Sequence, residues 1–184
     1  PIRSSAASDV YKRQIYSLKV LGVVQDGGLP HLGSDRICCE DYEQKRYVTS
    51  IMLINNETNE SYLFDASPDI NEQLNFMGKG IKKNLKGIFL THAHIGHYTG
   101  LMYFGREALN SKLMNVYAMP RMKKFLEQNG PWSQLVSLEN ISITELNNKS
   151  NIIIDSNVAV QPIEVPHRAE FSETVGYKIY GPNK

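Results

Sequence analysis

The chain has 184 residues, of which 41% are hydrophobic and 21% charged, and its formal net charge is +1. This composition is typical of one soluble globular domain, and no apolar run approaches the roughly 18 residues that a membrane helix needs. The near-zero charge gives no electrostatic reason to expect binding to nucleic acid or to a membrane. The two cysteines, Cys38 and Cys39, are adjacent, a spacing unsuited to a disulfide scaffold, so we expect a cytoplasmic setting.

Both ends of the chain differ from the rest of it. Residues 1–14 are polar and show no hydrophobic periodicity, and Lys184 follows closely on a predicted strand. We therefore expect residues 1–14 to be a non-native or disordered tail. We expect residues 15–184 to form an incomplete domain, that is, a fragment cut at both ends.

The first predicted elements are strands. Residues 15–24 alternate between apolar and polar side chains and predict a strand, and residues 25–33 form a loop rich in glycine and proline. This loop is open to two interpretations, a tight turn or a loop at the mouth of a site. Residues 47–54 and 61–64 predict a hairpin that ends at Asp65.

A helix is expected after the hairpin. Ser67 predicts its N-cap, Pro68 its first position, and Gly78 lies near its end. Asp69 fits a charge that favours the helix start. The buried stripe of this helix is predicted from apolar residues at helical spacing, namely Ile70, Leu74 and Met77.

The later elements alternate at first between strand and helix. Residues 87–90 predict a buried strand, and residues 98 to about 110 a helix. A strand over 114–118 and a helix over 120–128 follow, and Trp132 behind that helix is either a core anchor or a platform for substrate. Strands are predicted over residues 141–146, 151–154, 158–165 and 175–180.

Three of the five histidines lie within six residues, in the run Thr91-His-Ala-His-Ile-Gly-His97. His92 and His94 are two apart in extended backbone, so their side chains point the same way and can hold one ion. His97 lies past the bend and can face the same cavity. Because neutral imidazole is a common metal ligand, this spacing at a strand-to-helix turn predicts a metal site.

This run resembles the metal motif of the metallo-β-lactamase superfamily, His-x-His-x-Asp-His. In that family the first two histidines bind one metal, and the Asp and third histidine bind a second. Gly96 stands here at the Asp position and has no ligand atoms. The resemblance therefore implies a first metal site at His92 and His94, whereas Gly96 leaves the second site open.

The resemblance also implies roles for residues outside the motif. Asp65, which taken alone is a ligand, an orienting group or a turn residue, matches a strand-end Asp that orients the histidine motif. His167 matches the family's next metal ligand, a histidine that follows a later strand. Glu170 is open to three interpretations: a general base, a group beside the metal ligands, or a solvated carboxylate. The 25–33 loop followed by Cys38 and Cys39 looks like the PqqB-like branch of the superfamily.

The resemblance implies an α/β (α+β) fold, an αββα sandwich of two mixed sheets flanked by helices. It further implies a metal-dependent hydrolase with one or two zinc ions, in which metal-activated water attacks an ester, amide or phosphodiester of a small-molecule substrate. One alternative is a PqqB-like oxygenase or biosynthetic protein that uses iron, in which Gly96 leaves an open coordination position. The other is a non-catalytic binding or carrier protein. Because the fragment lacks the last strands of such a fold, we expect weak metal affinity and little turnover.

Overall fold

The computed structural model describes residues 14–40, 45–78, 83–168 and 170–181. The strands are β1 (Tyr16–Gly22), β2 (Ser50–Asn55), β3 (Ser61–Phe64), β4 (Leu85–Phe89), β5 (Met114–Ala118), β6 (Ile141–Glu145), β7 (Ile152–Asp155), β8 (Val158–Glu164) and β9 (Val175–Tyr180). The helices are α1 (Ile37–Glu40), α2 (Ile70–Asn75), α4 (Ile95–Tyr98), the 3₁₀ helix η1 (Thr99–Phe104), α5 (Pro120–Gln128) and α6 (Trp132–Ser137).

The strands form two sheets. The larger has the order β1-β2-β3-β4-β5-β6, antiparallel between β1, β2 and β3 and parallel from β3 to β6. The smaller, β7-β8-β9, is antiparallel over the described residues, whereas we expected two mixed sheets. The parallel half of the larger sheet needs crossover connections, and helices of the described chain supply these between β3 and β6.

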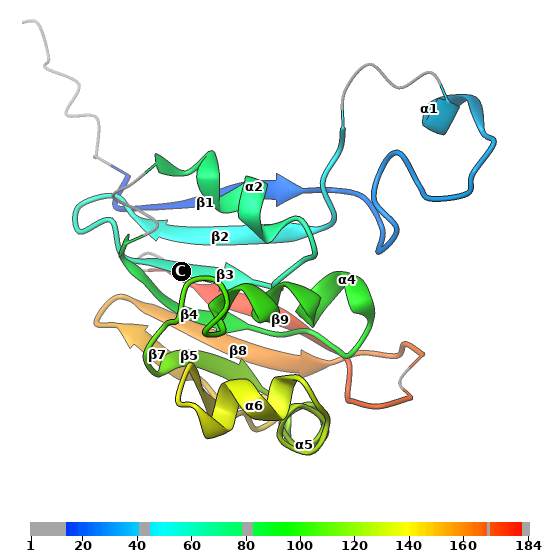
Figure 1. Cartoon of the computed structure of the whole chain (residues 1–184). Helices are drawn as coiled ribbons and strands as arrows, with labels where there is room; N and C mark the ends of the chain where they lie inside the picture. Colours follow the sequence, from blue (N-terminus) through cyan, green and yellow to red (C-terminus); the bar gives the residue numbers. More distant parts are fainter. Residues whose placement is uncertain (1–13, 41–44, 79–82, 169, 182–184) are drawn as a thin grey trace, which may run out of the picture.

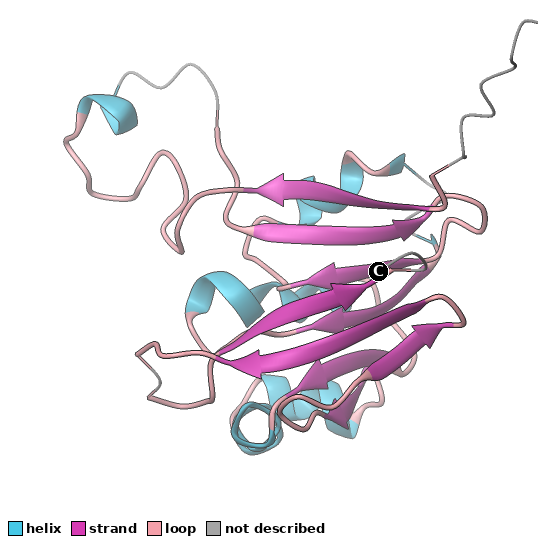
Figure 2. Cartoon of the chain, turned by 180° about the vertical axis from the view of Figure 1, so that it is seen from behind, coloured by secondary structure: helices cyan, strands magenta, loops and turns pink. Residues whose placement is uncertain are grey.

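The sheets and helices are stacked in layers. Helices α2, α4, α5 and α6 lie in front of the larger sheet in Figure 1, and the smaller sheet lies behind it. Figure 2, from the opposite side, shows the strands of the smaller sheet in front and the helices behind. Of the four layers of an αββα sandwich, the described residues thus form three, with one layer of helices.

Side-chain alternation along β4 produces two cores. Ile88 packs with the helical layer, whereas its neighbour Phe89 faces the smaller sheet. The Phe89 ring stacks on Tyr117 at 4.2 Å and on Phe64 at 5.1 Å between ring centroids. Burial of a large aromatic side chain between the sheets fixes the position of the end of β4.

The ends of β4 and β8 lie at the same edge of the molecule. The backbone N–H of Val175, at the start of β9, donates to the carbonyl of Thr91 at 3.1 Å. The buried hydroxyl of Tyr177 donates to the carbonyl of Leu90 at 2.6 Å. The segment after β4 and the segment between β8 and β9 are therefore held side by side, although they are far apart in the sequence.

Most of the predicted strands and the helix over 120–128 are confirmed, within one to three residues at each end. The first strand is shorter than expected, and Val24 forms only an isolated bridge with Val48. The predicted helix up to residue 110 is wrong. Its chain forms α4 and then η1, which ends at Phe104, and Asn110 has a positive φ of 48° that no α-helix contains.

Two further predictions concern single residues. Ser67 is not the N-cap, because α2 starts at Ile70 and the Ser67 hydroxyl instead accepts a hydrogen bond from the Asp69 backbone at 3.1 Å. Trp132 packs on Tyr98 and Phe125 at the edge of the helical core, which confirms the core anchor. Among the described residues, no helix combines the length and apolar character needed to cross a membrane.

Candidate metal centre

Three histidines from two distant segments meet where β4 and β8 end. His92 and His94 follow β4, and His167 follows β8. The ring of His167 lies 4.9 Å from the ring of His92 and 5.2 Å from that of His94, between centroids. One donor nitrogen from each of the three lies within 4.8 Å of the other two. The structure therefore brings together the three residues expected to hold the first metal.

His97 lies beside this triad but faces two carboxylates. Its ring centroid is 4.2 Å from that of His92. Its Nδ1 lies 2.7 Å from Asp65 Oδ2, and its Nε2 lies 3.3 Å from Asp26 Oδ1. Asp65 was predicted as a residue that orients the motif, whereas sequence reasoning missed Asp26.

Asp65 connects the larger sheet to the histidine motif. Its carboxylate accepts hydrogen bonds from the Thr91 backbone at 2.8 Å and from the Thr91 hydroxyl at 2.9 Å, besides contacting His97. Its backbone φ is 66°, a left-handed conformation in which Asp is tolerated better than most residues. The contacts of Asp65 are those expected of a residue that positions the metal ligands.

The histidines differ in their electrostatic environment. Burial, followed by the neighbouring imidazoles, lowers the pKa of His92 to about 3, so this side chain is neutral near pH 7. Burial also disfavours the charged form of His97, but the hydrogen bond and charge of Asp65, and then Asp26, outweigh it and raise its pKa. A neutral His92 presents the form of imidazole that binds metals.

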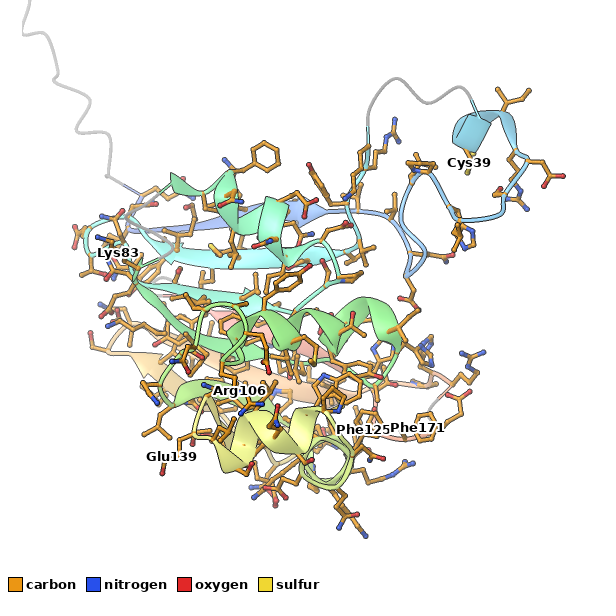
Figure 3. The ribbon with its side chains drawn as sticks, in the orientation of Figure 1. Cys39, Lys83, Arg106, Phe125, Glu139 and Phe171 are labelled. Atoms are coloured by element: carbon orange, nitrogen blue, oxygen red, sulfur yellow. The ribbon has the colours of Figure 1, made fainter. Side chains whose placement is uncertain are left out.

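Glu170 and Arg168 stand at the rim of the site. Glu170 Oε2 lies 3.3 Å from His94 Nε2, and Glu170 Oε1 lies 2.7 Å from Arg168 Nε. Glu170 has a lowered pKa because its own backbone N–H, and then His94 and Arg168, stabilise the carboxylate. The same loop is held in place by Phe171, whose ring lies 5.5 Å from that of Phe125 (Figure 3).

A cavity of about 700 Å³ opens above the histidines. The loop after β1 contributes Asp26, Gly27 and His31 to its wall, and His167 and Arg168 also line it. The interpretation of residues 25–33 as a loop at the mouth of the site is therefore confirmed. A signal was present in the sequence, because Asp26 is the one carboxylate in this loop, but nothing local connected it to the histidine motif.

Cys38 and Cys39 lie apart from the triad. They belong to the short helix α1, which stands away from the two sheets (Figure 3, with Cys39 labelled). Cys39 Sγ accepts a hydrogen bond from the His31 backbone at 3.4 Å, and the two sulfur atoms are 3.8 Å apart. Within the described ranges these cysteines do not take part in a group of three or more metal-ligating side chains.

Comparison with solved structures shows which proteins have a similar fold. The chain is similar in structure to Zn²⁺-bound PqqB from Methylobacterium extorquens, with a TM-score of 0.75 and 19% identity over 92% of this chain and 62% of that one. It is also similar to a diphosphatase of the PhnP family, with a TM-score of 0.64 and 22% identity over 89% of this chain and 61% of that one. A third similar structure is human tRNase Z, short form, with a TM-score of 0.57 and 16% identity over 91% of this chain and 66% of that one.

These similarities confirm the predicted metallo-β-lactamase fold, and the chain spans less than two thirds of each of these three proteins. No curated protein sequence matches the chain. The family model of the beta-lactamase superfamily domain matches residues 60–184, which include both histidine segments. The chain therefore belongs to the beta-lactamase superfamily.

Proposed function

We propose that this protein is a metal-dependent hydrolase whose first metal is held by His92, His94 and His167. The observation that carries the proposal is the convergence of three donor nitrogens within 4.8 Å at the base of an open cavity. Three histidine ligands leave a coordination position for water or substrate, as in catalytic zinc sites. The donor set fits zinc, and iron is the alternative.

The residues around the triad fit hydrolysis. A zinc ion held by His92, His94 and His167 would supply hydroxide at neutral pH, because zinc lowers the pKa of coordinated water to about 7. Asp65 and Thr91 fix the backbone and side chains of the motif. Glu170 is an ionised carboxylate next to His94 and can accept a proton at the rim.

The substrate that we propose is a small molecule with an ester, amide or phosphodiester bond. Arg168 lines the cavity and offers a permanent cation to a negatively charged group. Two of the similar structures are a diphosphatase and tRNase Z, which supports including phosphodiesters in this class. The similarity to PqqB supports, as a second candidate, a biosynthetic protein of the PqqB-like branch. That structure is zinc-bound, and iron in this candidate is part of our proposal, because imidazole ligands also suit iron.

The proposal is tested by metal content and hydrolysis together. The chain is loaded with zinc or iron, freed of excess ion by gel filtration, analysed for bound metal, and assayed with chromogenic esters, amides and phosphodiesters. We expect at least one ion per chain and slow hydrolysis of one substrate class, in keeping with the little turnover expected of this chain. The variant His92→Ala/His94→Ala loses the ion of the triad and the hydrolysis, because it removes two of three ligands.

His31→Ala is the matched control for metal content, since His31 lines the same cavity but lies outside both the triad and the histidine motif. We expect this variant to keep its metal. An unaltered chain that binds no zinc or iron contradicts the proposal. Selective retention of iron without hydrolysis favours the PqqB-like candidate, and bound zinc without turnover of any substrate class favours a carrier.

A further inference from the structure

The space beside Gly96 is filled by a side chain from another part of the sequence. A Cβ atom built on Gly96 would collide with Asp26 Oδ1 and would lie 2.8 Å from the Asp26 Cα. Asp26 belongs to the loop after β1, seventy positions earlier in the chain (96 − 26). Gly96 therefore makes room for Asp26, and a carboxylate stands where the histidine motif itself has none.

The orientation of His97 directs its second nitrogen at this carboxylate. Asp65 Oδ2 lies 2.7 Å from His97 Nδ1, so Asp65 fixes the ring and favours a proton on Nδ1. The opposite nitrogen, Nε2, faces Asp26 Oδ1 at 3.3 Å. A histidine held by a carboxylate on one nitrogen while the other faces a cavity has the arrangement of a metal ligand.

Asp26 and His97 lie at the same cavity as the triad. Asp26 and His97 both line this cavity together with His92, His94 and His167. The His97 side chain is 17% exposed and that of Asp26 is 36% exposed, so both reach the cavity from its wall. One imidazole and one carboxylate are donors that suit a divalent ion such as zinc, iron or manganese.

We propose that Asp26 supplies the carboxylate missing at position 96 and, with His97, holds a second divalent metal ion beside the ion of the triad. This proposal rests on the proposed function, because it adds an ion to the same centre. A side chain at position 96 and the Asp26 carboxylate would occupy one space, so the glycine at 96 is what admits the carboxylate of Asp26.

The test is the number of zinc ions bound per chain, measured by elemental analysis after equilibrium dialysis. We expect two ions for the unaltered chain and one for Asp26→Ala. Asp35→Ala is the matched control, because Asp35 is an exposed carboxylate in the same connection between β1 and β2. We expect this control to keep two ions, and circular dichroism checks that each variant is folded.

A reciprocal exchange tests the shared space without deleting the carboxylate. Gly96→Asp alone introduces the collision with Asp26, and we expect it to lower the thermal midpoint. The double variant Asp26→Gly/Gly96→Asp removes the collision with the Asp26 carboxylate but keeps the 2.8 Å approach to the Cα of residue 26. We therefore expect it to recover part of the lost midpoint and to bind two ions. Failure of the double variant to recover either property would overturn the proposal.

The outcomes separate this inference from the proposed function. One ion in both the unaltered chain and Asp26→Ala would overturn the second site and leave the metal of the triad in place. Two ions in both proteins, or none in Asp26→Ala, would likewise show that Asp26 is not the ligand of a separate second ion. No ion on the unaltered chain would overturn the proposed function and this inference together.

Discussion

Asp65 is the residue through which the larger sheet holds the histidine motif. Its carboxylate contacts the Thr91 backbone, the Thr91 hydroxyl and His97 Nδ1, all within 2.9 Å. The Asp65 backbone N–H in turn donates to the Phe89 carbonyl at 2.8 Å, which anchors the residue to the end of β4. The geometry of the histidine motif therefore depends on a carboxylate outside the triad.

We predict that Asp65→Asn weakens zinc affinity about 10- to 100-fold, the usual effect of removing a group that orients metal ligands. Asn tolerates the left-handed backbone at this position, so the fold is expected to persist. Competition with a chromophoric chelator measures the affinity.

Asp69→Asn is the control, because Asp69 is also a buried carboxylate but contacts Val48 and Lys45 rather than the motif. We expect this variant to keep the affinity of the unaltered chain. Equal weakening by both substitutions would show that the effect of Asp65 is a general loss of stability.

The sequence allowed the triad and Asp65 to be predicted because each lies at a strand end, where the fold of the family collects ligands. His92, His94 and His167 were expected as ligands of one ion, and the structure brings their nitrogens together. Asp26 could not be predicted as part of the site from the sequence. Its position is decided by the course of the 25–33 loop, and Gly96 carries no atom that could have pointed to it.

At the level of elements, the segment after the motif is shaped by the turn that follows β3. Gly100 in η1 approaches the backbone of this turn, and its N–H donates to the Ala66 carbonyl at 2.9 Å. A Cβ on Gly100 would collide with the Ser67 carbonyl and lie 2.9 Å from that of Ala66. This contact explains a glycine inside a helical segment, where it otherwise costs stability.

We predict that Gly100→Ala lowers the free energy of unfolding by about 1–3 kcal/mol, because the backbone around the added methyl group has to move. Urea denaturation measures the change. Gly176→Ala in β9 is the control, because its added Cβ would meet its nearest neighbour, Val165 Cγ1, at 3.9 Å. An unchanged free energy of unfolding in Gly100→Ala would contradict the close approach of η1 to the turn.

The segment after the histidine motif is also the one that was predicted least well from the sequence. Apolar residues after the motif follow a helical pattern, and periodicity alone predicted a helix to about residue 110. The structure instead has the 3₁₀ helix η1, followed by turns in which the Ser111 hydroxyl donates to the Phe104 carbonyl at 3.0 Å. Tertiary contacts, which a pattern in one segment does not contain, decide where such a helix ends.

At the level of the whole molecule, hydrogen bonds between polar side chains connect the two sheets at the edge opposite the histidines. Asn55 on β2 donates to the Asp155 carboxylate on β7 at 3.2 Å, and Tyr62 on β3 donates to the Ile154 carbonyl at 3.2 Å. The Tyr16 hydroxyl on β1 accepts a hydrogen bond from Asn55 at 3.4 Å and lies near the Asp155 carboxylate. Burial, and then this carboxylate, raises the pKa of Tyr16 to about 12.

The raised pKa of Tyr16 predicts a change of stability with pH. The folded state favours the neutral phenol, so its contribution is fully present below about pH 10, the unfolded pKa, and is lost as the pH rises through about 12. We predict that Tyr16→Phe costs about 0.5–1.5 kcal/mol at neutral pH. The free energy of unfolding of this variant should then fall less steeply than that of the unaltered chain between pH 10 and 12.

Urea denaturation at several pH values measures this dependence. Tyr103→Phe is the control, because Tyr103 is 41% exposed on η1 and far from Asp155 in the sequence. A difference between Tyr16→Phe and the unaltered chain that stays constant from pH 7 to 12 would contradict the contact between Tyr16 and Asp155.

The central claim, that His92, His94 and His167 hold one metal ion, is tested most directly by anomalous X-ray diffraction from crystals of the chain grown with zinc. We predict an anomalous peak about 2.0–2.1 Å from one nitrogen of each of the three histidines, the usual zinc–nitrogen distance. Zinc peaks only at surface side chains or crystal contacts, with none between these three rings, would contradict the account.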